Sequence, residues 1–260
     1  MANASGRFVW HDLMTTDTEG AKKFYGEVAG WGTQPFEGSP TPYTMFTTGG
    51  VPIGGVSALT DDMKKNHVPP HWLPAVSVDN VDETLAKATK LGAKTIAPAM
   101  DIPDTGRYAV IQDPQGATIS IFTPNPRTSS PGEAPKKGNF SWHELTTSDS
   151  VAAFDFYSKI FGWQKAGEFD MGAPMGIYQM YGQGGAPYGG MMTRTPEMPP
   201  PNWLCYIMVD DAKAAAERIK SGGGKVIVGP MQVPGESGDW VAIAIDPQGA
   251  ATAVHSAGNQ

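Results

Sequence analysis

The sequence has little cysteine and no long apolar run. Cys205 is the one cysteine in 260 residues, so an internal disulfide is excluded. No stretch approaches the 18 consecutive apolar residues of a membrane-spanning helix, and the opening "MANASGRFVWHD" has no apolar signal core. These absences predict a cytoplasmic protein that has no membrane partner.

Positive charge is also scarce. The chain carries 19 Lys and Arg residues against 26 Asp and Glu residues, a formal net charge of −7. No basic patch is evident in the sequence, so nucleic acid is not expected as a partner. The apolar fraction of 40% against a charged fraction of 17% is typical of a globular chain with a packed core.

An internal repeat organises the chain. "FVWHDLMTTD" at 8–17 matches "FSWHELTTSD" at 140–149, and "DPQGA" occurs at both 113–117 and 246–250. A repeat at this spacing indicates a duplicated domain. We therefore predict two tandem domains, at 7–123 and 139–256, joined by a linker at 124–138 that is rich in Pro, Ser and Gly.

Each copy contains the pattern β-α-β-β-β twice. Ala21, Phe24, Tyr25 and Val28 lie at helical spacing, which predicts a helix over 18–29 that ends at Gly30. Short runs of alternating or β-branched residues predict strands on either side, starting at 8–14 and resuming at 72–78. The predicted fold class is α+β, with four βαβββ units in the chain.

These motifs resemble the vicinal oxygen chelate superfamily, which includes glyoxalase I, bleomycin-resistance proteins and extradiol dioxygenases. The resemblance rests on the openings of the form "L..T.D......FY....GW", the strand that ends in "V.D", and the "DPQGA" turn, and it covers nearly the whole chain twice. It implies that paired βαβββ units form a curled mixed sheet around a cavity in each domain, with the helices outside.

The resemblance also implies where metal ligands would stand. Metal-using members place two histidines and a glutamate on strands that face the cavity. In this chain the first place holds Trp10 in the first copy and Trp142 in the second. The second place holds Trp72 and Trp203, and the third, that of the glutamate, holds Ser120 and Ala253. None of these side chains suits a divalent ion, so we expect no metal and no cofactor. The indoles instead suit a hydrophobic or aromatic small molecule.

Two carboxylates are candidate catalytic residues. Asp12 and Glu144 occupy matching places and share strand parity with Trp10 and Trp142, so each is a candidate general base. His11 and His143 point to the opposite face if the strand register is right. Further residues are predicted to contact the ligand: Tyr108, Trp240 and His255.

Three functions remain open from the sequence. The first is metal-independent binding of a small hydrophobic or aromatic molecule. The second is a cofactor-independent lyase, isomerase or hydroxylase that acts on such a molecule. The third is a metal-dependent glyoxalase or dioxygenase with a non-standard site that includes His11, His143 or His255. Because a tandem chain can satisfy the pairing of single-domain relatives internally, we expect a monomer or a loose homodimer.

Overall fold

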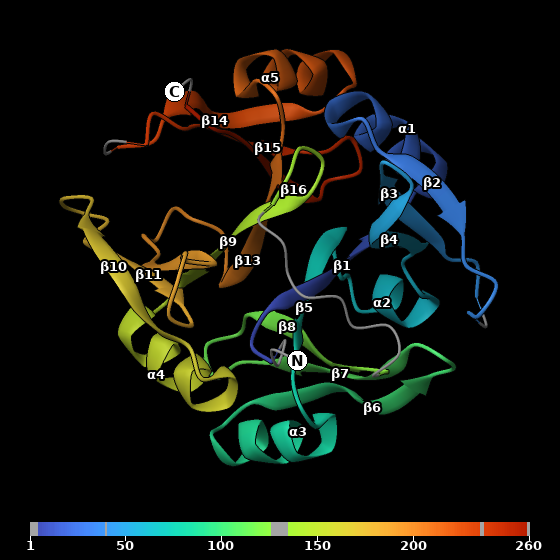
Figure 1. The fold of residues 1–260 in the computed structure, drawn as a ribbon, viewed down its shortest axis with the longest axis vertical. Coiled ribbons are helices and arrows are strands. Elements are labelled where there is room, and N and C mark those ends of the chain that lie inside the picture. The colour runs from blue at the N-terminus through green and yellow to red at the C-terminus, as the bar shows by residue number, and fades with distance from the viewer. Residues whose placement is uncertain (1–4, 40, 126–134, 235–236, 259–260) are drawn as a thin grey trace. The chain divides into compact units, whose positions relative to one another are not determined.

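The computed structural model describes residues 5–39, 41–125, 135–234 and 237–258. The first copy of the repeat contains β1 (Phe8–Thr15), α1 (Thr18–Ala29), β2 (Gly32–Pro35), β3 (Thr44–Thr48), β4 (Val51–Ala58), α2 (Asp61–Lys65), β5 (His71–Ser77), α3 (Val81–Lys90), β6 (Lys94–Ile102), β7 (Gly106–Gln112) and β8 (Thr118–Pro124). The second copy contains β9 (Phe140–Thr147), α4 (Ser150–Phe161), β10 (Gln164–Asp170), β11 (Ile177–Gly182), β12 (Gly189–Thr193), β13 (Asn202–Met208), α5 (Ala212–Ser221), β14 (Lys225–Gln232), β15 (Trp240–Ile245) and β16 (Ala251–Ser256) (Figure 1).

The helices begin and end where local chemistry requires. The Asp17 carboxylate accepts a hydrogen bond from the backbone N–H of Gly20 and caps α1, and Gly30 ends the helix in the left-handed conformation, at φ 73°. Asp149 and Gly162 cap α4 in the same way. The predicted helix over 18–29 is confirmed, including its buried apolar face.

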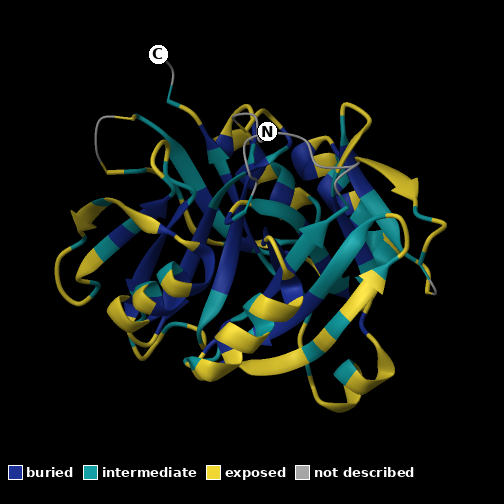
Figure 2. Ribbon diagram, turned by 60° about the horizontal axis from the view of Figure 1, so that its bottom comes forward, coloured by how far each residue is buried: buried dark blue, intermediate teal, exposed yellow. Residues whose placement is uncertain are grey.

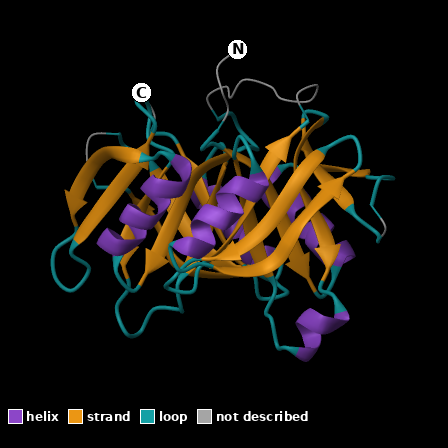
Figure 3. Ribbon diagram, turned by 90° about the horizontal axis from the view of Figure 1, so that it is seen from below, coloured by secondary structure: helices purple, strands orange, loops and turns teal. Residues whose placement is uncertain are grey.

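The strands form two mixed sheets of eight. Their orders are β2-β3-β4-β1-β5-β8-β7-β6 and β10-β11-β12-β9-β13-β16-β15-β14, one sheet from each copy. Within each βαβββ unit the first strand pairs in parallel with the last, as β1 does with β4, and the others are antiparallel. Strands dominate over helices (Figure 3), and the predicted α+β fold of four βαβββ units is confirmed.

Close packing groups the chain differently from the repeat. Unit 1 consists of Met1–Val9, Leu73–Glu133 and Trp142–Trp203, and unit 2 of Trp10–Trp72, Ala134–Ser141 and Leu204–Gln260. Each unit therefore combines one βαβββ module of the first copy with one of the second. The compact units differ in this way from the predicted ranges 7–123 and 139–256, which follow the repeat in the sequence.

Each unit has its own hydrophobic core between helices and strands. In unit 2, α1 packs against α5, and in unit 1, α3 packs against α4. Figure 2 shows buried residues concentrated in the strands and on the inner faces of the helices. In the described part of the chain, no helix is long and apolar enough to cross a membrane.

The "DPQGA" turn of one copy fastens the first helix of the other. In unit 2, Tyr25 on α1 donates its O–H to Asp246 Oδ2 over 3.1 Å and accepts the indole N–H of Trp72 over 2.9 Å. Asp246 Oδ1 accepts the backbone N–H groups of Gln248, Gly249 and Ala250. The aspartate thus holds both its own turn and the helix of the other copy.

Unit 1 contains the same arrangement with the copies exchanged. Tyr157 on α4 donates to Asp113 Oδ2 over 3.0 Å and accepts from the Trp203 indole over 3.3 Å. Gln115 of the turn also accepts the backbone N–H of Asp149, at the start of α4. The turn occurs twice because each copy supplies the anchor for the other copy's "FY" helix.

Candidate functional site

Strand β1 presents different residues on its two faces, as the alternation of a strand requires. Leu13 belongs to the core cluster of unit 2, and His11 is buried with its ring stacked 3.7 Å from that of Phe140. Trp10 and Asp12 alternate with these residues and remain partly exposed. The face that carries Trp10 and Asp12 is therefore the one on which a ligand can meet polar groups.

The first triad consists of Trp10, Asp12 and Tyr43 in unit 2. The indole N–H of Trp10 donates to Tyr43 Oη over 2.7 Å and to Asp12 Oδ1 over 3.1 Å. The Tyr43 hydroxyl donates to the same carboxylate oxygen. Two donors on one oxygen fix the orientation of the carboxylate and of the indole beside it.

The second triad consists of Trp142, Glu144 and Tyr178 in unit 1. The indole N–H of Trp142 donates to Tyr178 Oη over 2.7 Å, and the Tyr178 hydroxyl donates to Glu144 Oε2 over 3.0 Å. The same three kinds of side chain therefore recur in the second copy. The longer glutamate replaces the aspartate of the first triad.

A glycine makes room for each tyrosine ring. Gly55 on β4 lies opposite Asp12 in the parallel register, and Gly190 on β12 lies opposite Glu144. A Cβ at either glycine would overlap the ring of Tyr43 or Tyr178. Both tyrosines precede their glycine by twelve residues (43 to 55 and 178 to 190). This repeated Tyr–Gly spacing is a signal in the sequence that indicates the triads, and it lies outside the repeated motifs described above.

Burial controls the protonation of the first triad. Burial raises the pKa of Asp12 to about 6, although the hydrogen bonds from Tyr43 and Trp10 act in the opposite direction. Burial, together with the Asp12 charge, raises the pKa of Tyr43. In the second triad, burial and the Glu144 charge raise the pKa of Tyr178 in the same way. Both phenols therefore stay protonated and act as donors, while Asp12 changes charge near neutral pH.

Trp72 and Trp203 do not join these triads. Trp72 is 5% exposed, belongs to the core cluster of unit 2 and binds Tyr25 of α1, and Trp203 is 6% exposed in the core cluster of unit 1. The prediction that Trp72 shares a cavity with Trp10, and Trp203 with Trp142, is wrong. Strand parity is the reason: on β5 and β13 both indoles lie on the face covered by the helices.

Trp240 also lies on the helix side of its strand. It packs against the core cluster of unit 2, and Lys213 Nζ on α5 lies 3.7 Å from the centre of its ring. A role as a ligand wall on the other face is not compatible with this position. Its alternation with Ala242 and Ala244, which are fully buried in the same cluster, shows the same parity.

The remaining predicted residues lie apart from the triads' hydrogen bonds. Ser120 is buried on β8 and donates to the carbonyl of Ala109 over 3.2 Å, and Tyr108 is partly buried on β7. Ala253, the counterpart of Ser120, is fully buried on β16. His143 is buried and stacks 3.6 Å from Phe8, and burial lowers its pKa to about 3.

His255 has two polar neighbours in unit 2. Its Nδ1 lies 2.9 Å from Ser141 Oγ, and its Nε2 lies 3.4 Å from Asp239 Oδ2. All three side chains are partly exposed. The sequence predicted His255 as a ligand contact but gave no indication of these two partners.

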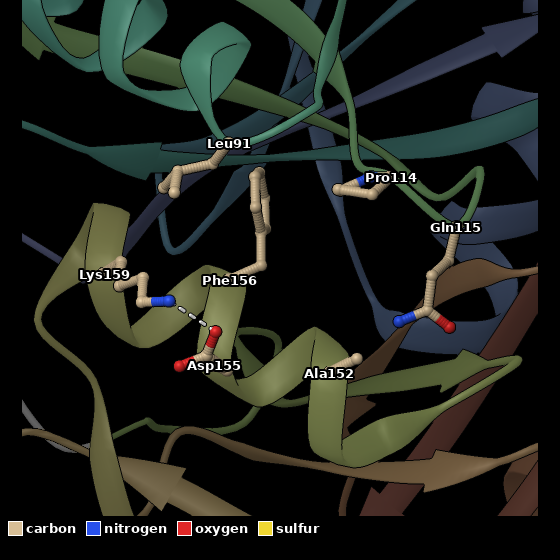
Figure 4. A pocket seen from close by; sticks show the side chains of 7 residues that line it. All are labelled: Leu91, Pro114, Gln115, Ala152, Asp155, Phe156 and Lys159. Carbon is tan, nitrogen blue, oxygen red and sulfur yellow. Dashed lines mark hydrogen bonds and ion pairs between the residues drawn. The ribbon is translucent and has the colours of Figure 1, made fainter.

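Two surface pockets lie away from all predicted site residues. The larger, of about 250 Å³, is lined in unit 1 by Leu91, Pro114, Gln115, Ala152, Asp155, Phe156 and Lys159 (Figure 4). Lys159 is ion-paired with Asp155 over 2.6 Å within α4. The other, of about 230 Å³, lies in unit 2 beside the end of α1, with Arg218 and Asp210 in its lining.

The side chains present do not fit a divalent metal centre at the places that the resemblance implies. Trp10 uses its N–H for Tyr43 and Asp12, Trp72 is in the core, and Ser120 donates to a backbone carbonyl. Within either unit taken alone, no three described His, Cys, Asp or Glu side chains lie close enough to share an ion. Indole and alanine side chains provide no ligand atom for such an ion.

Comparisons with known proteins agree on one family. A family model described as the Glyoxalase/Bleomycin resistance protein/Dioxygenase superfamily matches residues 7–121 and 139–253. The chain is 34% identical over 245 residues to the putative glyoxylase CFP32 of Mycobacterium bovis. This match covers 93% of this chain and 91% of that protein. It is also 32% identical over 128 residues to the anthracycline biosynthesis protein DnrV of Streptomyces peucetius, covering 44% of this chain and 45% of that protein.

Solved structures show the same fold. The 2,3-dioxygenase LapB from Pseudomonas sp. KL28 superposes with a TM-score of 0.67 at 13% identity, over 100% of this chain and 94% of that one. The Mn(II)-bound glyoxalase from Novosphingobium aromaticivorans superposes with a TM-score of 0.65 at 16% identity, over 97% and 82% of the two chains.

Proposed function

The chain belongs to the glyoxalase/bleomycin resistance protein/dioxygenase superfamily, and we propose that it binds a small hydrophobic or aromatic molecule at the two triads without a metal ion. The observation that carries the proposal is the repeated triad. An indole stands where the resemblance implies the first metal ligand, and in each copy its N–H donates to a tyrosine hydroxyl that in turn donates to a carboxylate.

Each triad offers a ligand one apolar surface and one polar anchor. The partly exposed indole of Trp10 or Trp142 provides a flat face for an aromatic ring. The adjoining carboxylate, Asp12 or Glu144, accepts a hydrogen bond from a hydroxyl or amine on that molecule. Because the indole and phenol are already hydrogen-bonded, little order is lost on binding. A phenolic or polycyclic aromatic compound combines the required features.

The relatives support an aromatic ligand and differ in metal use. DnrV takes part in the biosynthesis of an anthracycline, which is a polycyclic aromatic compound. The Novosphingobium glyoxalase, in contrast, is a Mn(II)-bound protein. The identity of the side chains at the implied ligand positions favours the metal-free alternative for this chain, since two of the three places hold tryptophan in both copies.

A second candidate function is proton transfer at Asp12. A carboxylate with a pKa of about 6 is suited to remove a proton from a bound molecule and to return it at another atom near neutral pH. The Tyr43 hydroxyl donates to Asp12 Oδ1 and would stabilise the charged form of that carboxylate. This candidate corresponds to an isomerase or a lyase and uses the same binding site.

One experiment separates these functions from metal-dependent chemistry. The purified protein is treated with EDTA and dialysed, its metal content is measured by mass spectrometry, and its tryptophan fluorescence is titrated with 2-naphthol. We expect saturable quenching in the metal-depleted protein. Trp10→Phe combined with Trp142→Phe should weaken the affinity for 2-naphthol about tenfold, a loss of about 1.4 kcal/mol of binding free energy.

Trp240→Phe is the matched control, because this indole lies on the helix side of its sheet. Its removal should change the fluorescence but not the affinity. Stoichiometric metal retained after dialysis, with quenching that requires the metal, would overturn the proposal. Turnover that is lost in Asp12→Asn, while 2-naphthol still binds, would support the proton-transfer function.

A further inference from the structure

Ser141, His255 and Asp239 form a chain of polar side chains that the triads do not use, which we name the relay. Ser141 Oγ lies 2.9 Å from His255 Nδ1, and His255 Nε2 lies 3.4 Å from Asp239 Oδ2. The other carboxylate oxygen, Asp239 Oδ1, accepts the backbone N–H of Gly258 over 2.8 Å. The aspartate is thus fixed by the backbone and faces the imidazole.

The relay has the three components of an activated nucleophile. A hydroxyl is in hydrogen-bond contact with an imidazole nitrogen, and a carboxylate faces the other ring nitrogen. In the tautomer that carries its proton on Nε2, the nitrogen nearer to Asp239, Nδ1 is the acceptor for the Ser141 proton. Such a set is defined by geometry and roles, so either ring nitrogen can serve as the base.

The fold does not require these residues. The repeat offsets of 132 and 133 place the corresponding positions of the first copy at Val9, Phe122 and Gly106. The first copy forms the same strands with an apolar residue in place of the serine, another in place of the histidine and a glycine in place of the aspartate. The relay is therefore a feature of the second copy alone, unlike the triads and the "DPQGA" turns.

The three side chains of the relay are partly exposed to solvent. Ser141 and His255 are partly exposed, and the side chain of His255 is 18% exposed while that of Asp239 is 28% exposed. The nucleophile is thus neither in the core nor on a fully solvated loop. Ser141 Oγ also lies 3.4 Å from the carbonyl of Tyr206, a weaker contact than that with His255.

We propose that Ser141 is a nucleophile activated by His255 and Asp239, and that the relay hydrolyses activated carboxylic esters with an aryl leaving group. Ser141 Oγ bonds to the ester carbonyl carbon, and its proton passes to His255 Nδ1. The bond from that carbon to the aryloxy oxygen breaks, and His255 returns the proton to the departing phenolate. Water then attacks the acyl carbon and gives a proton to His255. The bond from that carbon to Ser141 Oγ breaks, the carboxylic acid leaves, and the proton from His255 restores the Ser141 hydroxyl.

An aryl ester is the substrate class that this relay suits best. The nucleophile and base lower the barrier for attack, and a phenolate leaves more readily than an alkoxide. Such an ester therefore needs the least additional stabilisation of the tetrahedral intermediate. This activity is separate from binding at the triads and does not depend on it.

Two measurements test the relay. The intact protein is incubated with a fluorophosphonate probe, and the modified peptide is identified by mass spectrometry; p-nitrophenyl acetate hydrolysis is followed in parallel. We expect the label on Ser141, and a loss of about a hundredfold in the hydrolysis rate in Ser141→Ala and in His255→Gln. Ser158→Ala on α4 removes an exposed serine hydroxyl elsewhere and should retain the wild-type rate.

Labelling of the wild-type protein does not depend on the folding of any variant, so it tests Ser141 as the nucleophile independently of the substitutions. A label on another residue, or none, would overturn the proposal, as would an unchanged hydrolysis rate in a folded Ser141→Ala protein. Binding of 2-naphthol at the triads is measured separately, so failure of the relay and failure of the proposed function are distinguishable.

Discussion

Asp12→Asn should change how the stability of the protein depends on pH. The carboxylate is held among Trp10, Tyr43 and the strand β4, and burial raises its pKa from 3.8 to about 6. An acid whose pKa is higher in the folded than in the unfolded state binds more protons when folded. Protonation of Asp12 therefore stabilises the fold, and ionisation destabilises it.

The magnitude follows from the two pKa values. The difference between 3.8 and about 6 corresponds to at most about 3 kcal/mol at 25 °C. This contribution is fully present below about pH 4, is lost as the pH rises to about 6, and is absent above that. Asparagine is neutral at every pH, so Asp12→Asn should gain stability relative to wild type over the same range.

Urea denaturation at pH 4, 5, 6 and 7 measures the effect as the difference in unfolding free energy between variant and wild type. We expect this difference to rise by at most about 3 kcal/mol from pH 4 to pH 7, with most of the rise below pH 6. Asp61→Asn, at the solvent-exposed start of α2, is the control for loss of a surface carboxylate. A difference that stays flat with pH would refute both the raised pKa and the proton-transfer function that depends on it.

Three further substitutions test the packing around the site. Gly55→Ala should displace the Tyr43 ring and weaken 2-naphthol binding at the first triad, measured by fluorescence titration; unchanged binding would contradict the packing argument. Tyr25→Phe removes the hydrogen bond to Asp246 and should cost about 1–3 kcal/mol in urea denaturation, whereas no loss would show that the bond is dispensable. Trp72→Ala should cost about 3–5 kcal/mol in the same assay because the indole lies in the core, and a surface-like cost below 1 kcal/mol would place it elsewhere.

The sequence was sufficient to predict the fold because the repeat and the periodicities agree. The apolar stripe of α1, its cap at Asp17 and its end at Gly30 are local features, and each was confirmed. Two elements lack such a pattern. Strand β2 is exposed at every position, and α2 has five residues and buries none, so neither carries the apolar periodicity on which prediction depends.

The site was predicted only in part, because strand faces and tertiary partners are not local properties. Trp10 and Asp12 were assigned to one face of β1, as the structure has them. On β5 the assignment of Trp72 to the ligand face failed, since a change of one residue in register reverses every side chain. The bond of Tyr43 to the Asp12 carboxylate depends on the pairing of β3, β4 and β1, which the sequence pattern does not specify.

The packing of the copies was also beyond the sequence pattern. Matching motifs show that the two copies are alike, and they do not show which modules pack together. The contacts of Tyr25 with Asp246, and of Tyr157 with Asp113, join residues more than forty positions apart and from different copies. These contacts between the copies depend on how the helices pack on the strands, and a repeat in the sequence does not specify that packing.

Isothermal titration of the EDTA-treated protein with 2-naphthol tests metal-free binding at the triads most directly. We expect metal-free binding at up to two sites per chain, with an affinity about tenfold weaker at both sites when Trp10→Phe is combined with Trp142→Phe. Binding that appears only after Mn²⁺ is added, and whose affinity the double substitution leaves unchanged, would contradict this expectation.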